Sequence, residues 1–144
     1  RHRSSRAGCA LRPGIVVGMA TVIGDNAGSR SADEVDVVRA LFRAWRAGDV
    51  GAAEQLIAEE FVFTSPQDDR IDRASYLRRC FPTADRFVTH ELRHVLLATH
   101  GEVFALYEYE LADGSRYRNC EVLTVRDGRV AEVQVFFGGR VLSS

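Results

Sequence analysis

The sequence predicts an α+β domain in which helices come first and an antiparallel sheet follows. Between Val35 and Trp45 an apolar residue recurs every three or four positions, which is the spacing of one helix face. Further along, Asp113-Gly114 and Asp127-Gly128 each stand between runs of β-branched and aromatic residues, a strong hairpin signal. We therefore expect three N-terminal helices packed on one side of a curved, mostly antiparallel sheet. The 144 residues, 46% of them hydrophobic, suit a single domain.

Residues 1–30 differ from the rest in charge and composition. Their net charge is near +4 and that of the remainder near −5, and Gly, Ser, Ala and Arg dominate without lasting periodicity. We expect a basic, flexible extension over 1–30 and the folded domain over 31–144, with Met19 as a candidate start. The apolar run at 15–23 is too short to span a bilayer. A signal peptide is the alternative, because Arg residues precede the run, although no clear cleavage site follows it.

The helices are predicted from caps and periodicity. Ser31 or Asp33 can cap the first helix, and Gly48 ends it. Asp49 then caps a short second helix that contains Ala53, Leu56 and Ile57. A third helix over 72–81 is capped by Asp72 and ends before Pro82.

The first two strands flank that third helix. Phe61 to Thr64 forms a short strand stopped by Ser65-Pro66, and a polar loop over 67–70 follows. Phe87 to Ala98 alternates as a half-buried strand does. Its apolar side is expected to carry Val88, His90, Leu92, His94 and Leu96.

Two hairpins complete the sheet, and their turns fix which side chains share a face. A three-residue loop over 112–114 pairs Glu110 with Arg116 and Glu108 with Arg118, opposite charges on one face. The other face then carries Tyr107, Tyr109, Tyr117, Asn119 and Glu121. A second three-residue loop over 126–128 places Val133, Val135 and Phe137 opposite Glu121, Asn119 and Tyr117.

These polar groups on an apolar face indicate a ligand pocket. Glu121 is expected to have its pKa raised by desolvation and to act as an acid or base, with His90 or His94 as its partner. The remaining pocket residues are expected to orient or contact a ligand: Tyr107, Tyr109, Tyr117, Asn119, Trp45 and Phe137. The alternatives are a satisfied polar network in a core, half-buried strand histidines, tyrosines that form a wall or a dimer contact, or a two-residue loop that reverses the faces.

The loop after the first strand is a second candidate. Asp69, with Asp68, can supply an acid or hold a cation at the pocket mouth, and Arg70 or Arg73 can meet an anionic ligand. A solvated loop before a helix cap is the alternative. Two carboxylates without a third ligand at fixed spacing do not indicate a metal site, so we expect no metal and no cofactor.

Charge and cysteine content exclude several function classes. A net charge of −1 gives no reason to expect nucleic acid or a membrane as partner. Cys9, Cys80 and Cys120 lack the spacing of a zinc site or a disulfide framework, which favours a reduced cytoplasmic protein. All nineteen basic residues are Arg, as expected from a GC-rich, bacterial genome.

Two segments resemble a known family. AWRAGDVGAAEQLIAEEFVFTSP and RNCEVLTVRDGRVAEVQVFFG are similar to the SnoaL-like branch of the nuclear transport factor 2-like superfamily, and the resemblance covers roughly Asp33 to Gly139. The strongest marks are Ala47-Gly48-Asp49, Arg126-Asp127-Gly128 and the ending Val-Phe-Phe-Gly. The resemblance implies a cone-shaped α+β barrel with an apolar pocket at its open end, often in homodimers packed through the sheet.

The superfamily includes ketosteroid isomerases, limonene epoxide hydrolases, polyketide cyclases, dehydratases and non-catalytic binders, so the fold does not choose a function. The resemblance places the isomerase base at Ser65 and its oxyanion-hole phenol at Leu41, and neither residue can do that work. The isomerase's protonated acid falls at Glu121, which keeps a carboxyl, whereas the hydrolase acid falls at Val135.

Two functions therefore remain. The first is a cofactor-free isomerase, cyclase, hydratase or dehydratase that acts on a small hydrophobic or cyclic molecule. The second is a non-catalytic binding or dimerisation module, in which Glu121 and Asn119 satisfy each other. The enzyme is expected to need Glu121 exposed to the cavity and within hydrogen-bond range of His90 or His94, whereas an arginine that seals Glu121 favours the module.

Overall fold

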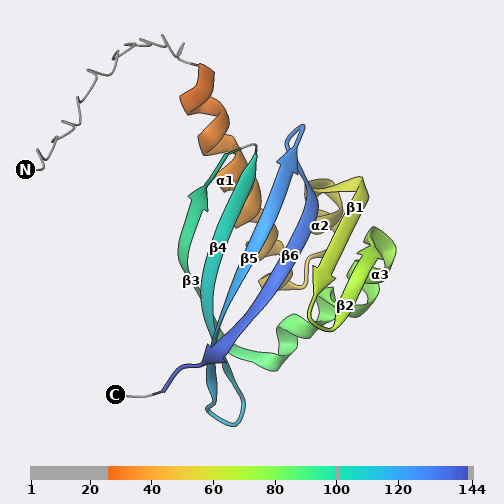
Figure 1. Cartoon of the computed structure of the whole chain (residues 1–144). Helices are drawn as coiled ribbons and strands as arrows, with labels where there is room; N and C mark the ends of the chain where they lie inside the picture. Colours follow the sequence, from red (N-terminus) through yellow and green to blue (C-terminus); the bar gives the residue numbers. More distant parts are fainter. Residues whose placement is uncertain (1–25, 100, 143–144) are drawn as a thin grey trace, which may run out of the picture.

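The computed structural model describes residues 26–99 and 101–142, in which helices cover one face of a single sheet (Figure 1). The helices are α1 (Asn26–Ala47), α2 (Val50–Leu56), α3 (Arg73–Arg79) and a 3₁₀ helix, η1 (Phe81–Arg86). The strands are β1 (Ile57–Ser65), β2 (Asp68–Asp72), β3 (Phe87–Leu97), β4 (Glu102–Leu111), β5 (Arg116–Arg126) and β6 (Arg129–Arg140). The predicted α+β class is confirmed.

The sheet has the strand order β2-β1-β6-β5-β4-β3. Strand β1 runs parallel to β6, and every other neighbouring pair is antiparallel, so the sheet is mostly antiparallel as predicted. In the described part of the chain β2 and β3 are the two edges. The sheet is curved but does not close into the barrel that the resemblance implied. None of the helices in this part is long and apolar enough to cross a membrane.

Local capping chemistry fixes three of the helix ends. Gly48 ends α1 with φ +65°, a conformation that a residue with a Cβ adopts only at a steric cost. Asp49 Oδ1 accepts a hydrogen bond from the Ala52 N–H at 2.9 Å, and Asp72 Oδ1 accepts one from Ser75 N–H at 2.8 Å. Both predicted caps are confirmed. The predicted start of α1 at Ser31 or Asp33 is wrong. The helix begins at Asn26, and no proline between Asn26 and Ser31 interrupts it.

Three element boundaries also differ from the prediction. Ile57 belongs to β1 and not to α2, because strand pairing with β6 begins there. The predicted loop at 67–70 contains most of β2, which pairs with β1 through Phe63 and Ile71. Beyond α3 the chain continues as η1, since Pro82 lies in its first turn, where a missing N–H is tolerated.

The hairpin between β4 and β5 has the predicted register, with Glu110 opposite Arg116 and Glu108 opposite Arg118. The hairpin between β5 and β6 reaches the predicted face by another route. Its turn has two residues, Asp127 (φ 50°) and Gly128 (φ 73°), instead of three. Alone this turn would reverse the face of β6, but a bulge at Ala131 reverses it again, since Val130 pairs with Val125 and Glu132 with Thr124. Glu121 therefore lies opposite Val135, and Asn119 opposite Phe137, so the predicted face is right but the predicted partners, Val133 for Glu121 and Val135 for Asn119, are wrong by two residues.

A second bulge separates the two histidines of β3. Leu92 pairs with Tyr107, but His94 pairs with Leu106, so Arg93 is an extra residue that shifts the alternation. His90 stays on the face toward the helices, whereas His94 and Leu96 turn to the outer face. Val88, beside a further bulge, is 59% exposed. The prediction that Val88, His94 and Leu96 share one apolar side with His90 is therefore wrong.

Candidate functional site

A cavity of about 570 Å³ lies between the inner face of the sheet and the helices. Aromatic and aliphatic side chains form most of its wall, from α1, α3, β1, β3, β4, β5 and β6. Among the predicted ligand-binding residues, those that line it are Trp45, Tyr107, Tyr109, Asn119 and Phe137. Two predicted acid/base residues, Glu121 and His90, also line it. Its size and mostly apolar wall suit one small ligand.

Glu121 belongs to a chain of hydrogen bonds along the cavity wall. The Tyr107 hydroxyl donates to Glu121 Oε1 at 2.8 Å, and Asn119 Nδ2 donates to the same hydroxyl at 3.4 Å. Asn119 Oδ1 in turn accepts the Gly138 N–H at 3.2 Å. Glu121 Oε2 has no partner in the described residues and is not sealed from the cavity. One carboxyl oxygen is thus positioned, and the other is open to a ligand.

Burial decides the ionisation of this network. Desolvation raises the pKa of Glu121 from its ordinary 4.5 to about 7, against the smaller, opposite effect of the hydrogen bond from Tyr107. Desolvation first, and the nearby charge of Glu121 second, raise the pKa of the Tyr107 phenol. The phenol therefore stays a neutral donor, while Glu121 is close to half ionised at neutral pH.

His90 lies in an aromatic box and not against the carboxyl group. Its ring stacks on Phe42 at 5.5 Å between centroids and also contacts Trp45 (5.1 Å) and Tyr107 (4.7 Å). Its Nε2 is buried and has no hydrogen-bond partner among the described residues. Desolvation, reinforced by the charge of Arg46, lowers the pKa of His90 to about 4, so the imidazole is neutral at pH 7.

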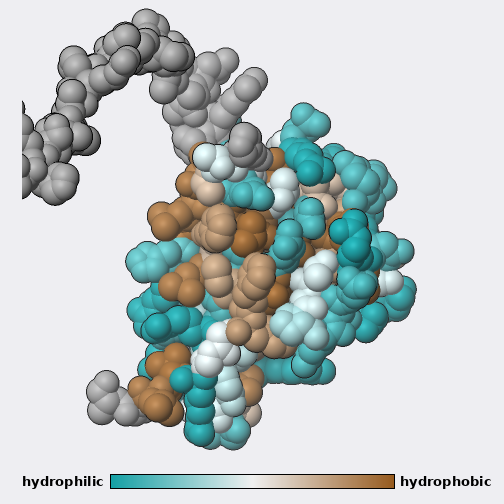
Figure 2. Space-filling model, in the orientation of Figure 1, coloured by the Kyte–Doolittle hydropathy of each residue, from teal (hydrophilic) through white to brown (hydrophobic). Residues whose placement is uncertain are grey.

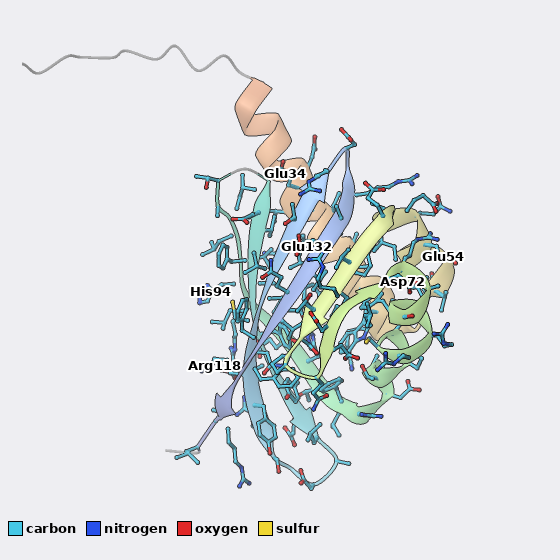
Figure 3. All side chains as sticks on the ribbon, turned by 45° about the vertical axis from the view of Figure 1, so that its right-hand side comes forward. Glu34, Glu54, Asp72, His94, Arg118 and Glu132 are labelled. Atoms are coloured by element: carbon cyan, nitrogen blue, oxygen red, sulfur yellow. The ribbon has the colours of Figure 1, made fainter. Side chains whose placement is uncertain are left out.

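The outer face of the sheet carries the charges that the hairpin register predicted. Three arginines, Arg93, Arg116 and Arg118, bond to Glu108, whose side chain is only 7% exposed. Hydrogen bonds from Arg118 and Arg93 lower the pKa of Glu108. Figure 3 shows Arg118 on the side of the sheet away from the helices, so no arginine of this pair of strands seals Glu121.

Three predicted site residues lie outside the cavity. The bulge in β3 puts His94 on the outer face, where Figure 3 shows it pointing away from the helices. Tyr117 stacks on Tyr109 at 5.6 Å without lining the cavity. Asp69 is exposed on β2, because its neighbour Asp68 takes the inward position.

Asp68, which was predicted at the pocket mouth together with Asp69, lines the cavity, and other cavity residues were not predicted. Asp68 pairs with Arg79 at 2.8 Å at the polar rim, next to Ser65 and Thr83. Tyr76 of α3 contributes a phenol to the wall. The signal for Tyr76 was its place after the Asp72 cap, on the apolar side of a short helix, which identifies a buried residue but not a cavity residue. In the parts of the chain described, no three His, Cys, Asp or Glu side chains come together as a metal site.

Comparison with known proteins adds a family to this geometry. The pattern of the SnoaL-like domain matches residues 38–133. No curated protein matches the chain.

Several solved structures share the fold. An NTF2-like protein of unknown function from Burkholderia xenovorans is 18% identical, with a TM-score of 0.69 over 81% of this chain and 91% of that one. A second one, from Mesorhizobium loti, is 24% identical, with a TM-score of 0.66 over 76% and 94%. A Kribbella flavida protein proposed to be a ketosteroid isomerase is 21% identical, with a TM-score of 0.65 over 79% and 84%. At these identities the likeness concerns the fold, and the domain match, which spans more than half of the chain, decides the family: the protein belongs to the SnoaL-like domain family.

Proposed function

We propose that the protein is a cofactor-independent enzyme that moves a proton on a small apolar or cyclic substrate, with Glu121 as the acid/base group. The observation that carries the proposal is the open oxygen of Glu121 on the wall of a mostly apolar cavity. A carboxyl group with a pKa of about 7 is available in both protonation states at neutral pH, which suits general acid/base catalysis.

The chemistry follows from that ionisation. The Glu121 carboxylate takes a proton from a carbon next to a carbonyl group, the electron pair of the broken C–H bond becomes the C=C bond of an enolate, and the π pair of the C=O bond moves to the oxygen. Glu121 then returns the proton to the same carbon or to a conjugated one. Return to the same carbon exchanges hydrogen with solvent, and return elsewhere isomerises the substrate. Cyclisation and dehydration can begin with the same proton transfer.

His90 has a different role from the one its sequence position suggested. No hydrogen bond joins it to Glu121 in the described structure, and its pKa of about 4 leaves the imidazole neutral at pH 7, so no imidazolium is present to act as the acid. The aromatic contacts on several sides of the ring support a part in shaping the cavity wall. We therefore assign the proton transfer to Glu121 alone, with Tyr107 and Asn119 holding its carboxyl group.

Hydrogen exchange into cyclic ketones tests the proposal. The protein is incubated in D₂O with a panel that includes 1-tetralone, and loss of the α-proton signal is followed by NMR. We expect faster exchange than in buffer for at least one ketone, and a fall of roughly 100-fold or more in Glu121→Gln. Glu132→Gln, on the outer face of the sheet (Figure 3), is the matched control. Equal exchange in wild type and Glu121→Gln would contradict the assignment.

The second candidate function is a binding module without turnover. The hydrogen-bonded chain from Asn119 through Tyr107 to Glu121 favours it, because buried polar groups form such chains simply to satisfy one another, without any catalytic role. A ketone that binds in the cavity without exchanging its α-protons would support this function over the first.

We also propose that the protein forms a homodimer through the outer face of its sheet. Three large apolar side chains are exposed there: Leu96 (61%), Phe104 (41%) and Phe136 (53%). Figure 2, which views this face, shows apolar surface over β3 to β6 and a hydrophilic surface toward β1 and β2. A contiguous apolar patch of this kind is typical of an interface.

A further inference from the structure

One part of the cavity rim carries arginines. Two of the residues that line the cavity, Arg79 at the end of α3 and Arg86 at the end of η1, are exposed, so their guanidinium groups lie where the cavity meets solvent. Phe87, the residue after Arg86, pairs with Leu111 at the end of β4. Arg86 therefore lies at the end of the sheet where the chain passes from α3 to β3, along the green segment of Figure 1.

The two arginines differ in their partners. Arg79 Nη2 forms an ion pair with Asp68 Oδ1 at 2.8 Å, and the Asp68 side chain is only 14% exposed, so the charge of Arg79 is compensated. Arg86 forms no ion pair with a carboxylate of the described residues, not even with its exposed neighbour Asp85. The N–H donors of Arg86 are therefore available to a molecule that occupies the rim.

A second guanidinium group supports this stretch of η1. Arg46 Nη1 of α1 donates to the carbonyl oxygens of Ala84 (3.4 Å) and Phe87 (3.2 Å), which lie on either side of Arg86 in the chain. Arg46 also has no carboxylate partner in the part of the chain that the structure describes. Its charge acts on the cavity wall, since it is the cause that follows desolvation in lowering the pKa of His90.

The aromatic wall of the cavity begins next to these charges. The rings of Trp45 and Phe87 lie 5.3 Å apart between centroids, and Tyr109 meets Phe87 edge-on at 4.6 Å. All three side chains line the cavity. Because Phe87 directly follows Arg86, an apolar ring that packs on this wall would hold a substituent within reach of the Arg86 side chain.

The balance of charge restricts what that substituent can be. Arg46 and Arg86 contribute two positive charges, and Asp85, the single acid of η1, removes one. A monoanion compensates the remaining charge, whereas a phosphate monoester would exceed it and add a negative charge to the cavity that holds Glu121. A carboxylate also matches the guanidinium group in shape, because its two oxygens accept two parallel N–H bonds.

We propose that Arg86, supported by Arg46, binds the carboxylate of an organic acid whose apolar ring lies in the cavity. The inference rests on the proposed acid/base function where it makes this acid the substrate, and it adds the class of substrate, an apolar cyclic carboxylic acid. Binding itself does not require Glu121. Arg86 holds the anionic end of the molecule at the rim, and the ring enters the cavity first.

Two compounds with the same rings and different charge test this inference. 2-Naphthoate carries a carboxylate, and 2-naphthamide carries a neutral amide in its place. Binding is followed through the indole N–H NMR signal of Trp45, the single tryptophan, which lines the cavity. We expect Arg86→Gln to weaken 2-naphthoate binding about tenfold without changing 2-naphthamide binding. Arg126→Gln, at an exposed arginine that does not line the cavity, should change neither.

Salt and a lysine variant separate a charge contact from a change in packing. Wild-type affinity for 2-naphthoate should fall between about 0.02 M and about 0.3 M NaCl, and this dependence should be weaker in Arg86→Gln. Arg86→Lys keeps the charge and should recover part of the lost affinity. Equal weakening of both compounds in Arg86→Gln, an effect no larger than that of Arg126→Gln, or no binding of 2-naphthoate to the wild type would overturn the inference.

The outcomes also distinguish this inference from the proposed function. Binding of 2-naphthoate that depends on Arg86, without Glu121-dependent exchange in any ketone, would remove the acid/base function and leave the carboxylate site standing. Exchange that depends on Glu121, with 2-naphthoate affinity indifferent to Arg86→Gln, would overturn the carboxylate site alone.

Discussion

Replacing Glu121 by Gln should change the stability of the protein in a manner that depends on pH. Glutamine keeps the shape of the side chain and an oxygen that can accept the Tyr107 hydroxyl, but it does not ionise. In the wild type, the folded state holds the Glu121 proton up to a pH of about 7, whereas the unfolded chain releases it near 4.5. Between these values the folded state binds more protons, so wild-type stability falls as pH rises.

The size of the effect follows from the two pKa values. Moving the pKa from 4.5 to about 7 lowers the free energy of unfolding of the wild type by about 3 kcal/mol. This loss is absent below pH 4.5 and complete above pH 7. We therefore expect Glu121→Gln to match the wild type near pH 4.5 and to exceed it by up to about 3 kcal/mol at pH 8.

Urea unfolding of both proteins at several pH values between 4.5 and 8 measures this difference. Other titrating groups, His90 among them, affect both proteins and largely cancel in the subtraction. Glu132→Gln reports the effect of replacing a carboxyl by an amide on the outer face of the same sheet. A difference between wild type and Glu121→Gln that stays constant over this range would refute the burial of Glu121 in an apolar wall.

Three further predictions concern other parts of the molecule. The wild type should lose stability as the pH falls from 6.5 to about 4, because the unfolded chain protonates His90 in this range and the folded protein does not. His90→Phe should remove this loss. Urea unfolding at pH 4.5 and 7 would contradict the prediction if the free energy of unfolding changed equally in both proteins. Gly138→Ala should lower the free energy of unfolding by about 2 kcal/mol or more, since the added Cβ would lie 1.9 Å from the Arg118 carbonyl oxygen, while Gly139→Ala, with nothing within 4 Å, should unfold like the wild type. Equal urea midpoints for Gly138→Ala and Gly139→Ala would show that β6 does not approach the Arg118 carbonyl group of β5 this closely. Phe136→Asp should convert a dimer to a monomer in sedimentation experiments, whereas Val50→Asp, also at an exposed apolar position but on α2, should leave the dimer intact; a monomeric wild type would refute the interface.

The inward position of Glu121 could be predicted because local chemistry determines it. The Asp113-Gly114 turn sets the register of β4 and β5, and the opposite charges at Glu108 and Arg118 agree with only one assignment of the faces. On β6 the predicted faces were right although the turn length was wrong. A bulge at Ala131 compensated for the shorter turn, and nothing in the sequence around Ala131 predicts that bulge.

The bulge at Arg93 shows why the two histidines were wrongly placed together. Alternation along a strand assumes uninterrupted pairing, and one extra residue sends every later side chain to the other face. Bulges depend on how neighbouring strands curve around a core, which is tertiary information. His94 was predicted to be inside for this reason, and the same shift gives the outer face Leu96.

Tyr76 was not predicted as a cavity residue, and Asp69 was predicted at the pocket mouth beside Asp68 although only Asp68 lines the cavity. Strand β2 is a polar edge strand whose partly buried apolar residue, Ile71, gives too weak a pattern to distinguish it from a loop. Its pairing with β1 directs Asp68, and not Asp69, to the rim. Periodicity identifies Tyr76 as buried, but its place on the cavity wall depends on groups from β1, η1 and β5, which come together only in the folded protein.

The pKa of Glu121 is the most direct test of the central claim that this carboxyl group lies against an apolar cavity as an acid/base group. It can be measured from the pH dependence of its side-chain ¹³C signal, assigned by comparison with Glu121→Gln. The account predicts a midpoint near 7, moving further when 1-tetralone fills the cavity. A midpoint near 4.5, unmoved by the ketone, would contradict it.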